Sequence, residues 1–206
     1  FGLKQPKDPI IPQGSEHQTN LNFVDPKLFI GIEVELENFM EANHLAPFWV
    51  VKEDNSLRNH GREYISVPLR GKSLDIALNQ LFTYLPEQIS FSPRTSIHIH
   101  LDVTRLSPEE IAKILLLYSA VERVLYNFVG QDRADSIFCV PWYFSTFNRI
   151  WPFLEHLNQG LEYQAEGDRY SGLNLNSLQK FGTLEFRQLH GTKDIKKIVR
   201  WINLIQ

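Results

Sequence analysis

The sequence predicts an α+β domain with a mainly antiparallel sheet and packed helices. Stretches that alternate apolar and polar residues, as strands with one buried face do, come in blocks. A few long stretches with helical periodicity separate these blocks, without the regular strand–helix–strand alternation of a parallel sheet. The chain has 206 residues, of which 43% are hydrophobic and 22% charged, so it is long enough to bury such a core.

The first strand is expected from about Leu28 and alternates strictly over residues 31–37. Three apolar residues face one side of it, and the other side carries Glu33, Glu35 and Glu37. Two further strands are expected over residues 47–51 and 61–67, with a turn at 53–57 whose Asp and Asn side chains can bond their own backbone.

Ser73 is expected to cap a helix that runs to Leu85, followed by a strand over residues 96–103. Ser107, Pro108 and Glu110 then form a capping box with proline at the first helical position, the clearest helix start in the chain. This helix should end at Gly130. Its predicted buried stripe consists of Ile111, Ile114, Leu115, Tyr118, Val121, Leu125 and Phe128.

The aromatic-rich segment 137–153 is interpreted mainly as core, with a substrate wall as the alternative, and Cys139 within it as an inert buried thiol. Short strands are expected over residues 173–176 and 183–187, and Asp194 should cap a final amphipathic helix.

The domain organisation is predicted to be an irregular, proline-rich N-terminal arm over residues 1–27 and one catalytic domain over 28–206. The chain lacks an initial Met and stops inside an apparent helix, so we expect a domain truncated at its C-terminus. The sequence predicts no oligomeric state.

The net charge of −3 and the lack of a Lys/Arg run give no basis for docking to nucleic acid or to a membrane surface. No apolar run reaches the length of a membrane span. The single cysteine excludes an internal disulfide and a multi-cysteine zinc site. It also suits a reducing compartment, which favours a cytoplasmic location.

Three expected strands combine an apolar face with a face of charged or metal-capable groups. Neighbouring carboxylates on one strand lie about 7 Å apart and resist joint ionisation unless solvent or a cation compensates them. Mg²⁺ or Mn²⁺ would prefer such oxygen ligands. Each group also has an interpretation without a metal. The glutamates can form a solvated acidic face, and the histidines can be exposed or hydrogen-bonded within the fold. Glu185 and Arg187 can form a simple ion pair, and Asn174 and Asn176 can be polar residues at a strand edge. No phosphate-binding P-loop, dinucleotide, HExxH or GxSxG motif is present.

Six short stretches in order resemble the amidoligase family of carboxylate–amine ligases, which shares the glutamine synthetase and γ-glutamylcysteine ligase fold. They cover most of the chain, and their number and order make the resemblance specific although each is short. The stretches are Gly31–Glu35, Asp54–Leu57, Glu63–Leu69, His98–His100, Arg169–Asn174 and Thr183–Thr192.

The resemblance implies a glutamine synthetase-like, curved antiparallel sheet around ATP and two or three Mg²⁺ or Mn²⁺ ions. The implied metal ligands are Glu33, Glu35, Glu63, His98 and Glu185. His100, Arg187, Arg169 and Asn174 are implied to contact ATP phosphates or the acyl substrate, with Arg187, Glu35 and Arg169 acting in catalysis. Asp54 is a further acidic candidate whose loop spacing fits less well.

The activity implied is ATP-dependent amide formation through an acyl phosphate, between an amine and a small-molecule, peptide or protein carboxylate. For such a reaction the protein must screen the charge of the triphosphate, align the carboxylate with the γ-phosphate and stabilise the transferred group with a fixed cation. It needs little covalent chemistry of its own. Two other classes stay open: a metal-dependent hydrolase that uses the same Glu and His groups to activate water, and a non-catalytic domain with a degenerate site.

Overall fold

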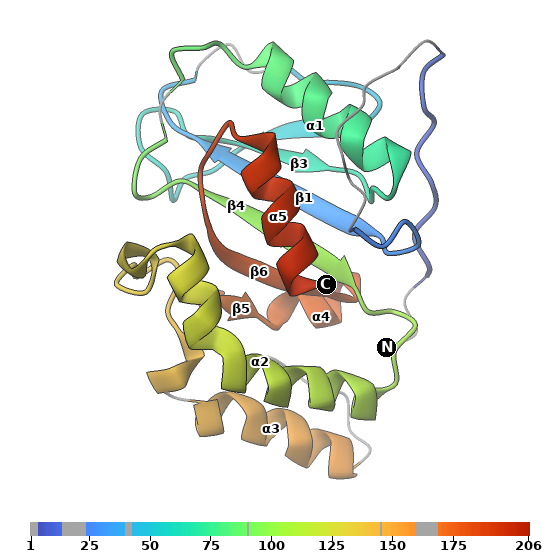
Figure 1. Ribbon diagram of the computed structural model, residues 1–206, viewed down its shortest axis with the longest axis vertical. Coiled ribbons are helices and arrows are strands. Elements are labelled where there is room, and N and C mark those ends of the chain that lie inside the picture. Colours follow the sequence, from blue (N-terminus) through green and yellow to red (C-terminus); the bar gives the residue numbers. More distant parts are fainter. Residues whose placement is uncertain (1–3, 14–23, 40–42, 90, 145, 160–168) are drawn as a thin grey trace. The chain divides into compact units, whose positions relative to one another are not determined.

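The computed structural model describes residues 4–13, 24–39, 43–89, 91–144, 146–159 and 169–206 (Figure 1). The chain forms two compact units. Unit 1 consists of Phe1–Gln5 and Asp102–Gln188, and unit 2 consists of Pro6–Leu101 and Leu189–Gln206.

Unit 2 is built on an antiparallel sheet in the order β2-β3-β1-β4. Its elements are β1 (Ile30–Leu36), β2 (Trp49–Glu53), β3 (Arg62–Ser66), α1 (Lys72–Tyr84), β4 (Ser96–Asp102) and α5 (Ile195–Ile205). The antiparallel character expected from the alternating stretches is confirmed. The central strand β1 buries its apolar residues completely, and Val34 lies opposite Tyr64 of β3 and Ile97 of β4.

Helices α1 and α5 contact each other and supply the apolar side chains that cover this sheet (Figure 1). Trp49 of β2 is 1% exposed and donates its indole N–H to the carbonyl of Ala77 in α1, 2.9 Å away. Trp201 and Ile202 of α5 are fully buried. The expected N-cap of α5 is confirmed, because the carboxylate of Asp194 accepts from the N–H of Lys197.

The expected N-cap of α1 is wrong. The capping position is occupied by Gly71 at φ 47°, without a side-chain cap bond, and Ser73 lies inside the first turn. The hydroxyl of Ser73 instead donates to the carbonyl of Arg70, at 2.9 Å, and accepts from its N–H. Gly71 therefore makes the turn into the helix. Its positive φ explains why the residue is a glycine, because a residue with a Cβ rarely adopts that conformation.

Unit 1 combines helices with the antiparallel pair β5–β6. Its elements are α2 (Pro108–Val129), the 3₁₀ turns η1 (Gln131–Arg133) and η2 (Trp142–Phe144), α3 (Thr146–Gln159), β5 (Leu173–Asn174), α4 (Asn176–Phe181) and β6 (Thr183–His190). Residues from Leu189 on belong to unit 2. Helix α3 packs along α2 (Figure 1). The capping box of α2 is confirmed, with Ser107 and Glu110 bonded in both directions.

The predicted stripe of α2 is only partly correct. Phe128 is 42% exposed, whereas Glu122, which the periodicity did not select, is completely buried. In the aromatic segment, Trp142 and Phe153 are core residues but Trp151 is 51% exposed. The side chains of Phe144 and Phe147 lie outside the described part. The expected burial of Cys139 is confirmed.

Two boundaries near the C-terminus also differ from expectation. The strand expected over residues 173–176 is shorter, because α4 begins at Asn176, and this short helix was not predicted. Gly182 ends α4 at φ 69°, the left-handed conformation typical of a helix C-terminus. The following strand β6 continues past Arg187 to His190.

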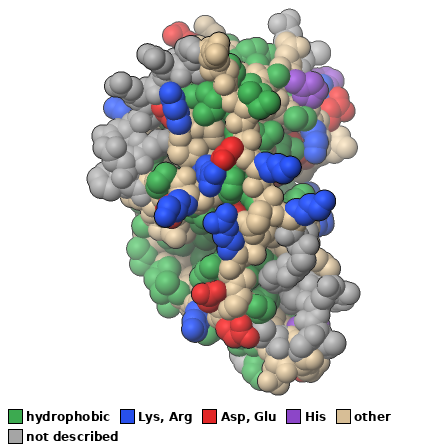
Figure 2. Space-filling model, turned by 90° about the vertical axis from the view of Figure 1, so that its right-hand side faces the viewer, with side chains coloured by type: hydrophobic (Ala, Val, Ile, Leu, Met, Phe, Trp, Pro, Cys, Tyr) green, Lys and Arg blue, Asp and Glu red, His purple; other side chains and the backbone are tan. Residues whose placement is uncertain are grey.

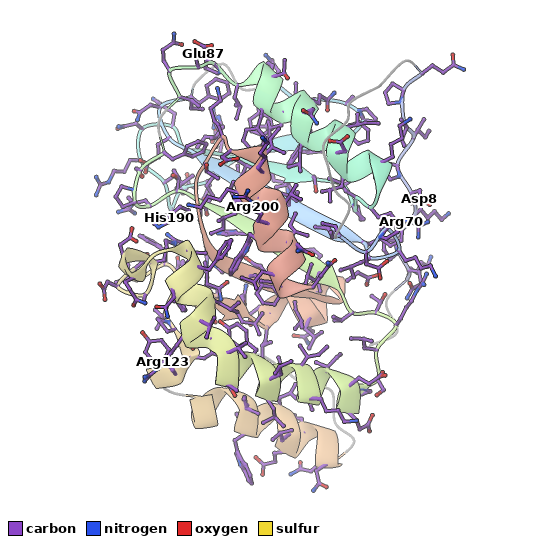
Figure 3. All side chains as sticks on the ribbon, in the orientation of Figure 1. Asp8, Arg70, Glu87, Arg123, His190 and Arg200 are labelled. Atoms are coloured by element: carbon purple, nitrogen blue, oxygen red, sulfur yellow. The ribbon has the colours of Figure 1, made fainter. Side chains whose placement is uncertain are left out.

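Residues 4–13 form neither helix nor strand, and the carboxylate of Asp8 forms a two-point ion pair with Arg70 of unit 2 (Figure 3). Basic and acidic side chains are interspersed on the face drawn in Figure 2. Among the described helices, none is both long and apolar enough to cross a membrane.

We expect Ser107→Ala to lower the free energy of unfolding by about 1 kcal/mol, because it removes the side-chain acceptor for an otherwise unbonded N–H at the start of α2. Urea denaturation measures the change. Lys113→Ala, an exposed substitution on the same helix, should stay within about 0.5 kcal/mol of the wild type. Equal losses in both variants would contradict the assignment of the cap.

Candidate functional site

The register of three neighbouring strands brings the predicted metal-capable side chains of unit 2 together. Glu35 of β1 lies opposite Glu63 of β3, and Glu33 of β1 lies opposite His98 of β4. His100 lies opposite Gly31. Directly opposed residues of antiparallel strands point to the same side of the sheet, so this face carries three carboxylates and two imidazoles.

Glu33 and the two histidines form the centre of this group. The Oε2 atom of Glu33 is 3.1 Å from Nδ1 of His98, and its Oε1 atom is 3.3 Å from Nε2 of His100. Both imidazoles are at least nine-tenths buried. The tautomer of each ring decides which atom donates, but in either case one carboxylate contacts two rings.

Glu35 is 4% exposed and is held by Ser96 at the start of β4. Its Oε2 atom accepts from the N–H of Ser96 at 2.8 Å and from the hydroxyl at 2.6 Å. Its Oε1 atom is 3.5 Å from Nε2 of His98, which also contacts the Ser96 hydroxyl at 2.8 Å. The imidazole of His98 therefore lies between the two carboxylates of β1.

The acidic side chains of this face ionise unequally. Burial disfavours the charged form of Glu33, but hydrogen bonds from His100 and His98 outweigh it and hold the pKa of Glu33 well below its usual range. Burial, together with the negative charges of Glu33 and Asp54, raises the pKa of Glu63 to about 7. Glu63 thus keeps its proton to a higher pH than an ordinary glutamate does.

Two further acidic residues have structural partners. Glu37, the third glutamate of the predicted strand face, accepts from the N–H of Arg58 at 2.9 Å, and its carboxylate lies 4.0 Å from the guanidinium of Arg94. Asp54 accepts from the N–H of Ser56 at 2.8 Å, the side-chain turn expected for that loop. Both residues stabilise the loop after β2.

A second group of predicted site residues lies within unit 1. Glu185 of β6 is opposite Asn174 of β5 and is 4% exposed. Its Oε2 atom accepts from the amide of Asn174 and the hydroxyl of Ser177, both at 2.6 Å. Its Oε1 atom accepts from the guanidinium of Arg187, also at 2.6 Å. The same-face ion pair expected as one interpretation of Glu185 and Arg187 is therefore present.

Arg169 has a different environment from the other predicted residues. It is exposed in the turn before β5, with its guanidinium 4.8 Å from the centre of the Tyr170 ring. Arg187, in contrast, has a side chain that is 12% exposed and is fixed by Glu185.

The serines that orient the carboxylates were not selected from the sequence. Ser96 shares the period-2 face of His98 and His100, so extending the alternation by one step would have identified it. Ser177 gave no such signal, because it lies in α4, the helix that the sequence did not predict.

The donor set of unit 2 fits a divalent cation. Carboxylate oxygen and imidazole nitrogen atoms are suitable ligands, and ligands on one octahedral ion at about 2.1 Å lie about 3 Å from each other. The Glu33–His98 and Glu35–His98 contacts, at 3.1 and 3.5 Å, are close to that spacing.

These features define a mixed α/β protein with a candidate cation site on an antiparallel sheet. The particular family follows from the comparison with family models, in which one described as "Putative amidoligase enzyme" matches residues 52–206. This match covers most of the chain, so the chain belongs to the amidoligase family, and the expected resemblance is confirmed. The match includes Glu63, His98 and Glu185, whereas Glu33 and Glu35 precede it. Neither the curated proteins nor the solved structures gave a significant match.

We expect Glu63 to make stability fall as pH rises from about 4.5 to about 7. The folded protein holds this proton more tightly than the unfolded chain does, so raising the pH removes a proton that favours folding. Glu63→Gln is neutral throughout, so its stability relative to the wild type should be higher at pH 8 than at pH 5 in urea titrations with EDTA.

Glu87→Gln is the control for that pH effect, because Glu87 lies exposed after α1 (Figure 3). Its difference from the wild type should be the same at both pH values. A Glu63→Gln difference that is also constant with pH would contradict the raised pKa.

Proposed function

We propose that this protein is an ATP-dependent carboxylate–amine ligase that forms an amide bond through an acyl phosphate. Membership of the amidoligase family supports the reaction class. The observation that carries the proposal for this chain is the face shared by β3, β1 and β4, where Glu33, Glu35 and Glu63 gather around two buried histidines. The proposal includes a glutamine synthetase-like fold for the chain.

We propose Mg²⁺ or Mn²⁺ as the cations. Glu33, Glu35, Glu63 and His98 would hold two or three ions, and Glu185 is assigned to the same role by the family resemblance. When bound, the ions would screen the charge of the triphosphate. His98 supplies a ligand atom without adding negative charge, which limits the repulsion among the glutamates.

The proposed reaction has two balanced steps. A substrate carboxylate oxygen attacks the γ-phosphorus of ATP, the bond to the bridging oxygen breaks, and ADP leaves. The amine nitrogen then attacks the acyl carbon, inorganic phosphate leaves, and the nitrogen loses a proton to give the amide. Each step needs alignment and charge stabilisation more than a covalent intermediate on the protein.

Within this proposal, Arg187 holds the transferred phosphoryl group. A guanidinium is permanently charged and planar, and it offers donors matched to phosphate oxygens. Its ion pair with Glu185 fixes the direction of the side chain before substrate binds. His100 is assigned to an ATP phosphate, and Asn174 and the exposed Arg169 are assigned to phosphate or acyl substrate. The acid is an amino acid, peptide or protein carboxylate.

Thermal unfolding with Mg²⁺, with ATP and with both tests the nucleotide site. A ligand at 100 times its dissociation constant stabilises the native state by about 2.7 kcal/mol, which for a chain of this size raises Tm by several degrees. We expect this shift with Mg²⁺ and ATP together, and its loss in Glu35→Gln, which keeps the shape of the side chain but removes a negative ligand.

The control for this measurement is Glu53→Gln, an exposed glutamate of β2 outside the group, which should shift like the wild type. A shift with the metal alone, indifferent to ATP, would favour a hydrolase. No shift under any condition would overturn the nucleotide site.

Hydroxylamine, a small reactive amine, tests the acyl phosphate without knowledge of the natural amine. We expect Mg²⁺, ATP and a suitable amino-acid or peptide carboxylate to give hydroxamate and ADP in equal amounts. Arg187→Lys should lower the rate at least about tenfold, because Lys keeps a charge but loses the planar donor set. ADP release without hydroxamate from any carboxylate of a broad panel would argue against the intermediate.

A further inference from the structure

Arg133, the last residue of η1, is a buried cation that has no carboxylate partner among the residues that the structure describes. It is 1% exposed, and among the described residues it forms no ion pair. Its Nε atom donates to the carbonyl of Gln188 at 3.0 Å, and its Nη2 atom donates to the carbonyl of Arg187 at 2.8 Å. Within the described part, its Nη1 atom has no hydrogen-bond partner.

This placement of Arg133 is costly for the fold. A guanidinium stays charged at any relevant pH, and removing it from water without a counter-charge disfavours folding. Its polar neighbours Cys139 and Tyr126 are neutral groups whose pKa values burial raises. Arg133 opposes the rise at Cys139 through its charge and a side-chain hydrogen bond, but neither neighbour supplies a counter-charge. An ion pair therefore does not account for an arginine at this position.

The bonds of Arg133 converge on the strand segment that carries Arg187. The N–H of Arg187 donates to the carbonyl of Gly172 at 2.8 Å, its carbonyl accepts from Arg133, and its side chain donates to Glu185. Gly172 is itself tightly packed, since a Cβ there would lie 2.4 Å from the hydroxyl of Tyr126. The peptide groups of Arg187 are thus bonded on both sides.

We propose that Arg133 is a positioning residue that holds β6 so that the guanidinium of Arg187 keeps the geometry required to bind a phosphoryl group. The catalytic value of this arrangement rests on the proposed function. The arrangement itself is a property of unit 1 and can be measured without nucleotide. Arg133 acts through the backbone, by donating to the carbonyls of Arg187 and Gln188.

The same buried cluster offers a matched control. Tyr118 accepts from the amide of Gln188 at 2.8 Å and donates to the carboxylate of Glu122 at 2.7 Å. Tyr118→Phe removes both bonds from a side chain that is also buried, so it should destabilise unit 1. It leaves both bonds of Arg133 to the strand in place.

The first readout is the ¹⁵N–¹H signal of the Arg187 Nε group, assigned by its loss in Arg187→Lys. In the wild type its heteronuclear NOE should be close to that of the rigid backbone. In Arg133→Met it should fall towards the value of Arg200, an exposed residue of α5 (Figure 3). Arg133→Lys, which keeps the charge and a donor, should restore part of it, and Tyr118→Phe should leave it unchanged. An unchanged signal in Arg133→Met would overturn the proposal, as would an equal loss in Tyr118→Phe.

The second readout is the affinity for Mg²⁺ and ATP, measured by calorimetry at a temperature where circular dichroism shows every variant folded. We expect Arg133→Met to weaken binding about tenfold, because the loss of one charge-assisted hydrogen bond to the ligand changes the affinity by about that factor. Tyr118→Phe should bind as the wild type does. Equal weakening in both variants would leave Arg133 a purely structural role and overturn the proposal. If the wild type binds no nucleotide, the ligase proposal fails, and the Arg187 signal still decides whether Arg133 positions that side chain.

Discussion

The antiparallel register of β1 with its two neighbours is the constraint on which the candidate cation site depends. It pairs Glu35 with Glu63 and Glu33 with His98 on one face, while Val34 pairs with Tyr64 and Ile97 on the other. A slip of one residue would bury the carboxylates in the hydrophobic core and expose the apolar side chains. The fully buried apolar residues of β1 therefore fix the register of the fold and, through it, the arrangement of the acidic face.

The acidic face also shows how carboxylates are accommodated at close range. Despite burial, hydrogen bonds from two imidazoles hold the pKa of Glu33 well below its usual range, and burial raises the pKa of Glu63 to about 7. The carboxylate of Glu35 accepts from both hydrogen-bond donors of Ser96. Each arrangement lowers the repulsion between neighbouring carboxylates. On the proposed function, a divalent cation would add positive charge among the same carboxylates, which would become its ligands.

The sequence predicted what local rules determine and missed what tertiary packing determines. Strict alternation located β1 and β4, and the Ser-x-x-Glu pattern located the capping box at Ser107. The second strand, expected over residues 47–51, lies instead at Trp49–Glu53. Ser73 failed as a cap because a left-handed glycine makes the turn instead, which composition alone does not reveal. Helical periodicity likewise placed Phe128 in the core and overlooked Glu122, whose buried carboxylate accepts from the N–H groups of Trp142 and of the residue after it. A polar side chain with distant partners has no signature in the periodicity of its own helix.

The two groups of predicted site residues differ in how completely hydrogen bonds and ion pairs within the protein compensate their negative charge. Glu185 already accepts three short hydrogen bonds, from Asn174, Ser177 and Arg187, so its charge is satisfied in the protein alone. A guanidinium has five N–H donors, so on the proposed function Arg187 can bind phosphate while it keeps its ion pair with Glu185. On the proposed function, the acidic face of unit 2 binds the cations through Glu33, Glu35, Glu63 and His98. Cation affinity is therefore expected to depend on these unit 2 residues, while the ion pair of Glu185 with Arg187 keeps the guanidinium directed for a phosphate-bearing ligand.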